Sequence, residues 1–130
     1  MKILAGVELF AAFSFIAFWL YWLNFAKKED WMPAGFMDHE RLFVFPDLTI
    51  AGIFGLSAYF LLNDNMAGLH TSLLGAGMMM FLIIIDIVYL GKNGLFALKR
   101  NGGEHITIIL LLIIICVFIT FSVFSQLLKA

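Results

Sequence analysis

The sequence predicts an all-α integral membrane protein, a bundle of four transmembrane helices with a short interfacial segment in the first loop. Hydrophobic residues make up 63% of the 130 residues and charged residues only 13%, whereas soluble domains carry about 25% charged residues. The apolar residues form four long runs, each near the roughly 20 residues that a helix needs to cross a bilayer. We therefore expect one transmembrane domain over residues 1–130.

The four runs predict helices at about residues 3–26, 46–62, 66–90 and 106–128. They must be helical because backbone N–H and C=O groups find no water to pair with inside a bilayer. Polar segments separate them at Lys27–Asp30, Asn63–Asn65 and Gly91–Gly94. The first run is too long for a signal peptide and no A-x-A-like cleavage site follows it, so we expect it to be retained.

The first loop is richer in apolar residues than an ordinary linker. Residues 31–45, WMPAGFMDHERLFVF, mix aromatic and aliphatic side chains with charged ones. That mixture is typical of a segment that lies partly buried at the membrane surface.

Lysine and arginine residues predict the orientation in the membrane. Lys2 and Lys129 lie on one side, and six basic residues lie on the other, in the first and third loops. These six are Lys27, Lys28, Arg41, Lys92, Lys99 and Arg100. Because cytoplasmic loops carry the excess of positive charge, we expect the first and third loops to be cytoplasmic and both termini to lie outside.

Composition also excludes several classes of function. The chain has a net charge of −1, which does not provide the broad basic surface that nucleic acid requires. Its single cysteine, Cys116, lies inside an apolar run, so neither an intrachain disulfide nor a CxxC motif exists. No cofactor is indicated by any motif.

Asp86 stands in the otherwise apolar stretch FLIIIDIVYL. At 100° per residue it shares a helix face with Gly68 and Gly75, and Ser72 lies close to that face. Small residues allow membrane helices to approach one another, so we expect Asp86 to point into the bundle. There it either binds an ion or ligand, or forms a structural hydrogen bond to Tyr59 or Thr107.

Asp47 follows Pro46 at the start of the second predicted helix. An aspartate at this position commonly caps the helix, because free N–H groups and the helix dipole favour a negative charge there. Asp47 is also in the same half of the membrane as Asp86, so the two carboxylates are expected to converge. Glu40 and His39 lie at about the same level, as do Glu104 and His105.

Glu8 lies about one and a half turns into the first predicted helix, and His70 lies near the outer end of the third. Their similar depth predicts a pH-sensitive pair, since histidine titrates near neutrality. The alternatives are that Glu8 extends to the outer interface and that His70 is a surface residue.

Ionisable residues inside a membrane cost about 2.5 to 3.5 kcal/mol on insertion scales and are functional candidates by default. Glu8 and His70 on the outer side, with Asp47 and Asp86 on the inner side, favour ion- or proton-linked transport or channel activity. Four short helices rarely enclose a pathway alone, so this hypothesis implies a homo-oligomer surrounded by membrane lipids.

Two alternatives remain open from the sequence. The first is a binding protein for a lipidic small molecule, or a membrane enzyme, with an acidic pocket. No catalytic residues are assigned, because a matched acid, base and cleft are not evident. Metal ligands are not assigned either, since the spacing of Asp47, Asp86 and the nearby histidines matches no standard motif. The second alternative is an accessory or structural subunit with a membrane partner.

Overall fold

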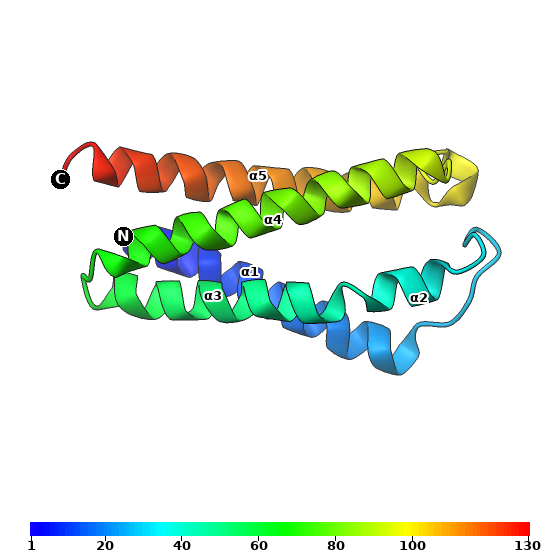
Figure 1. Cartoon of the computed structure of the whole chain (residues 1–130), viewed down its shortest axis with the longest axis horizontal. Helices are drawn as coiled ribbons and strands as arrows, with labels where there is room; N and C mark the ends of the chain where they lie inside the picture. Colours follow the sequence, from blue (N-terminus) through cyan, green and yellow to red (C-terminus); the bar gives the residue numbers. More distant parts are fainter.

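A computed structural model describes residues 1–130 as a bundle of four long helices (Figure 1). These are α1 (Lys2–Phe25), α3 (Val44–Leu62), α4 (Ala67–Lys92) and α5 (Gly102–Leu127), with the short helix α2 (Phe36–Arg41) and a 3-10 turn at Leu98–Arg100 between them. No β-strand is present. The predicted all-α fold with four spans and a short segment in the first loop is confirmed.

The four long helices run antiparallel, so the chain has two distinct ends (Figure 1). We call the end that holds both termini and the turn at residues 63–66 the terminal end. The other end, which holds residues 26–43 and 93–101, is the loop end. The blue N-terminus and red C-terminus lie at the same end of the bundle in Figure 1.

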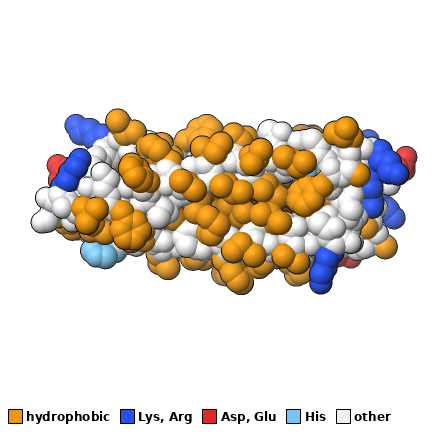
Figure 2. Space-filling model, turned by 90° about the horizontal axis from the view of Figure 1, so that it is seen from above, with side chains coloured by type: hydrophobic (Ala, Val, Ile, Leu, Met, Phe, Trp, Pro, Cys, Tyr) orange, Lys and Arg blue, Asp and Glu red, His pale blue; other side chains and the backbone are white.

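The surface of the bundle matches a multi-pass membrane protein. All four long helices are long and apolar enough to cross a membrane. Large side chains such as Phe13, Phe81 and Phe121 are exposed on the outside of the bundle. Figure 2 shows the hydrophobic side chains spread along the middle of the molecule, with charged side chains at its two ends.

Helix boundaries differ from the predicted ones by a few residues. The largest difference is at α5, which begins at Gly102 rather than near residue 106. The prediction placed the start at the first apolar residue, whereas the helix continues through Gly102–His105 beyond the apolar span. The second span likewise begins at Val44, where Pro46 is tolerated because N–H groups in the first turn have no intrahelical partner.

The helices pack in the order α1, α3, α4, α5, and α1 and α5 contact each other much less than the other neighbours do. Small residues of α4 allow the closest approach, against α3. A Cβ atom added at Gly68 would lie 2.7 Å from Leu61, and one added at Gly75 would lie 2.6 Å from the ring of Phe54. The stripe of small residues therefore faces the bundle, as the sequence predicted.

Arg100 holds the two loops of the loop end together. Its Nε and Nη2 atoms donate to the carbonyl of Trp31 at 3.2 and 3.1 Å, and its Nη1 atom donates to the carbonyl of Asn93 at 2.8 Å. Directly after it, the chain turns at Asn101, in the left-handed region with φ 58°, and enters α5. Gly102 packs there against the backbone of Phe96.

Candidate functional site

Glu8 is the most unusual polar residue of the bundle. Its side chain is completely buried, with 0% exposure, and neither carboxyl oxygen has a hydrogen-bond partner. It belongs to the buried face of α1, between Leu4 and Ala12, which are also buried. Buried polar groups are nearly always hydrogen-bonded, so an unpaired carboxyl group in a natural protein requires an explanation.

Two buried serines from two other helices lie beside Glu8. They are Ser57 of α3 and Ser72 of α4, both fully buried. Their hydroxyl oxygens are 2.8 Å apart, and both lie within 2.9 Å of the carbonyl oxygen of Gly68. The serine hydroxyls bond to each other and to this carbonyl. They also face Glu8, but neither carboxyl oxygen of Glu8 reaches hydrogen-bond geometry with them.

The structure does not bring His70 to Glu8. His70 is exposed, and its Nδ1 atom lies 3.2 Å from the carbonyl of Met66 in its own helix. The only ion pair in the chain joins Arg41 to Asp38 on the surface. The predicted pair of Glu8 and His70 is thus not formed, because His70 lies on the outer face of α4 while Glu8 faces the interior.

Asp47 lies in the first turn of α3, but it does not cap the helix through its side chain. Its carboxylate instead accepts a hydrogen bond of 2.9 Å from the indole Nε1 of Trp19 in α1. Trp19 is only 2% exposed. The contact therefore joins α1 to α3 inside the bundle, near the loop end.

Asp47 and Asp86 lie near each other, as the sequence predicted, and Glu40 of α2 completes an acidic cluster. Glu40 lies near both aspartates, and Asp86 lies near Asp47. Asp86 forms no hydrogen bond to Tyr59 or Thr107; Tyr59 is exposed, and the hydroxyl of Thr107 donates to Gly103. No group of three or more His, Cys, Asp and Glu side chains is arranged to hold a metal ion.

The histidines of the loop end face aromatic rings. His39 stacks on Tyr89 with their ring centres 3.6 Å apart, and His105 packs edge-on against Trp31 at 4.9 Å. Neither Nε2 atom has a hydrogen-bond partner. Both histidines thus pack against aromatic rings at the loop end of the bundle.

The two carboxyl sites are separated by an apolar interior. Glu8 and Trp19 are eleven residues apart in α1, which corresponds to about 16 Å along the helix at 1.5 Å per residue. Buried side chains fill the space between these levels, among them Ala12, Phe54 and Met79.

Trp19, Ser57 and Ser72 were not identified as site residues from the sequence. Tryptophan near a helix end is expected at a membrane interface whether or not its N–H has a partner. Serine in a membrane helix usually bonds to its own backbone, which hides any second role. Only the packing of the helices in the order α1, α3, α4, α5 shows that these residues surround the carboxyl groups.

Removal of the Trp19 indole N–H is expected to destabilise the bundle. Trp19→Phe leaves Asp47 without its donor, and a hydrogen bond to a charged group is worth about 1.5 to 3 kcal/mol. Trp22→Phe is the matched control, because Trp22 is also buried but its indole donates no hydrogen bond. Thermal unfolding in detergent should show a larger loss for Trp19→Phe, and equal losses would contradict a role for the bond.

Comparison with known proteins gives no further guide to the site: no protein-family model, curated protein or solved structure matches the chain.

Proposed function

We propose that the protein transports protons or small cations across the membrane as a homo-oligomer, with Glu8 as the central ion-binding group. The observation that carries this proposal is the complete burial of the Glu8 carboxyl group without a partner. An ionised carboxylate in such surroundings is strongly unfavourable unless it is paired. Glu8 therefore has to hold a proton or bind a cation, and exchange between these two states is the elementary step of proton-linked transport.

The acidic cluster supplies a second ion-binding site at the loop end. Asp47 and Asp86 come from α3 and α4, the same helices that contribute Ser57 and Ser72 beside Glu8. A movement of α1 relative to α3 and α4 would thus change the surroundings of Glu8 and of the acidic cluster at the same time. The apolar side chains between them favour a carrier that alternates between two conformations over an open channel.

Two glycines on the surface of α3 support association with further copies. Gly52 and Gly55 of α3 have no neighbouring atoms within 4 Å of the position that a Cβ would take. They leave a shallow place on the lipid-facing side where another membrane helix can approach closely. A second protomer at this place would add a further wall to the pathway, which four helices alone do not enclose.

The proposed orientation has the loop end in the cytoplasm. Six of the eight Lys and Arg residues belong to this end or its loops, and short cytoplasmic loops carry the excess of positive charge. The acidic cluster then faces the cytoplasm, and Glu8 lies in the outer half of the membrane.

The test is proton flux in liposomes that contain the purified protein and a pH-sensitive dye, driven by a potassium gradient with valinomycin. Wild type is expected to acidify or alkalinise the lumen faster than empty liposomes do. Glu8→Gln removes the exchangeable proton, so its flux is expected to fall to that of empty liposomes.

The matched control is Asp64→Asn. It removes one carboxylate from the same end of the bundle, but Asp64 is exposed in the turn between α3 and α4. Asparagine also tolerates the left-handed conformation of this residue, φ 53°. Equal flux in wild type, Glu8→Gln and Asp64→Asn would contradict the proposal and favour an accessory role for the protein.

A further inference from the structure

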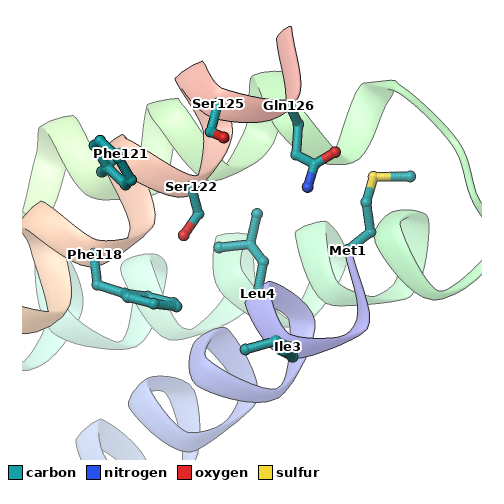
Figure 3. Close-up of a pocket in the computed structure, with 8 residues that line it drawn as sticks. All are labelled: Met1, Ile3, Leu4, Phe118, Phe121, Ser122, Ser125 and Gln126. Atoms are coloured by element: carbon teal, nitrogen blue, oxygen red, sulfur yellow. The ribbon is translucent and has the colours of Figure 1, made fainter. Parts of the chain in front are cut away.

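A hollow lies between α1 and α5 at the terminal end. Its volume is about 310 Å³, at the lower end of the range of about 300 to 1,000 Å³ for small-molecule pockets. Figure 3 shows that α1 contributes one wall and α5 the other. The lining residues are Met1, Ile3, Leu4, Phe118, Phe121, Ser122, Ser125 and Gln126. Five of these eight side chains are hydrophobic.

The polar side chains of the hollow lack partners. Ser122, Ser125 and Gln126 form no hydrogen bond through their side chains, whereas every other serine and threonine of the chain donates one to a backbone carbonyl. In Figure 3 the Ser122 hydroxyl and the Gln126 amide point from α5 toward Leu4 of α1. Their oxygen atoms are thus free to accept hydrogen bonds from a bound molecule.

Glu8 lies one helical turn from the floor of this hollow. Leu4 lines the hollow and is four residues before Glu8, so the two side chains lie one above the other on the same face of α1. The carboxyl group of Glu8 lies beside Ser57 and Ser72, and Glu8 does not itself line the hollow. Leu4, which is 3% exposed, separates the two.

We infer that this hollow binds an amphiphilic ammonium compound, a molecule with an apolar body and a protonated amine. When Leu4 moves aside, the ammonium group pairs with the carboxyl group of Glu8. The apolar lining suits the body of the molecule. The rings of Phe118 and Phe121 can attract the ammonium group through their faces, and Ser122 and Gln126 can accept its N–H groups. The substrate class rests on the proposed function, since Glu8 is the central group in both.

The experiment uses phenethylammonium as the probe and phenethyl alcohol as its neutral counterpart, with the full chain in lipid nanodiscs. Calorimetric titration and thermal unfolding are expected to show binding of the ammonium compound and much weaker binding of the alcohol. Glu8→Gln and Gln126→Met are each expected to weaken binding by about tenfold or more, the loss expected for one hydrogen bond to a charged group.

Ser122→Phe fills the hollow and is expected to abolish binding. Ser14→Phe is its matched control, because Ser14 lies on the exposed side of α1 and its hydroxyl is bonded to the Phe10 carbonyl. If Ser122→Phe does not fold, Gln126→Met, which adds no bulk, tests the role of the hollow in its place.

The outcomes separate the two proposals. Equal binding of the alcohol and the ammonium compound, or binding that is unchanged in Glu8→Gln and Ser122→Phe, would overturn the inference and identify the hollow as an apolar crevice. Proton flux that depends on Glu8 would then still support transport. Conversely, ammonium binding that depends on Glu8 and Ser122, without flux of protons or phenethylammonium in liposomes, would support the site and overturn the transport function.

Discussion

Replacement of Glu8 by methionine is expected to stabilise the bundle by about 1 to 3 kcal/mol, the cost of leaving a buried polar group unpaired, and to abolish transport. Methionine is unbranched and adapts to irregular space, so it can occupy the place of Glu8 beside Ser57 and Ser72. The measurement is reversible unfolding of the purified protein in mixed micelles, combined with flux in liposomes. A gain of stability together with a loss of flux would identify Glu8 as a residue kept for function.

Glu8→Gln is the control for this experiment. It keeps the shape and polarity of the side chain, so it is expected to give little stabilisation while losing flux to the same extent. If Glu8→Met destabilises the protein by several kcal/mol, the carboxyl group contributes to packing, and the functional interpretation of its burial is wrong.

Gly102→Ala is expected to destabilise the protein by about 3 kcal/mol or more, at the upper end of the range for overpacking. A Cβ atom at this position would overlap the carbonyl oxygen and carbon of Phe96. Because these are backbone atoms, they cannot move aside without breaking the bond of 2.9 Å between the Gly102 N–H and the Ala97 carbonyl. Thermal unfolding and the yield of folded protein after extraction both measure this loss.

The neighbouring residue, Gly103, provides a control for which the opposite change in stability is expected. Gly103 has no atom within 4 Å of the position of a Cβ, and alanine favours a helix over glycine by about 1 kcal/mol. Gly103→Ala is therefore expected to be neutral or mildly stabilising. Equal destabilisation by both substitutions would show that the loop end does not hold Gly102 against Phe96 in the membrane.

The sequence predicted the existence and approximate extent of the four helices because length and hydrophobicity decide what crosses a bilayer. It also predicted that Gly68, Ser72 and Gly75 face the bundle, since a stripe of small residues has one physical use in a membrane helix. The predicted start of α5 was four residues late, because hydrophobicity marks the apolar span and not the end of the helix.

Tertiary structure decided which polar groups meet. The depth of Glu8 and His70 in the membrane could be read from the chain, but their directions around the bundle could not, and the structure turns them apart. Likewise, Asp47 pairs with Trp19 of α1, a contact between residues 28 positions apart. The sequence by itself therefore determined the membrane fold and the carboxyl groups that are candidates for function. The rotation and pairing of the helices depend on side-chain packing across the whole bundle, and they determine which carboxyl groups are paired and which one is left free.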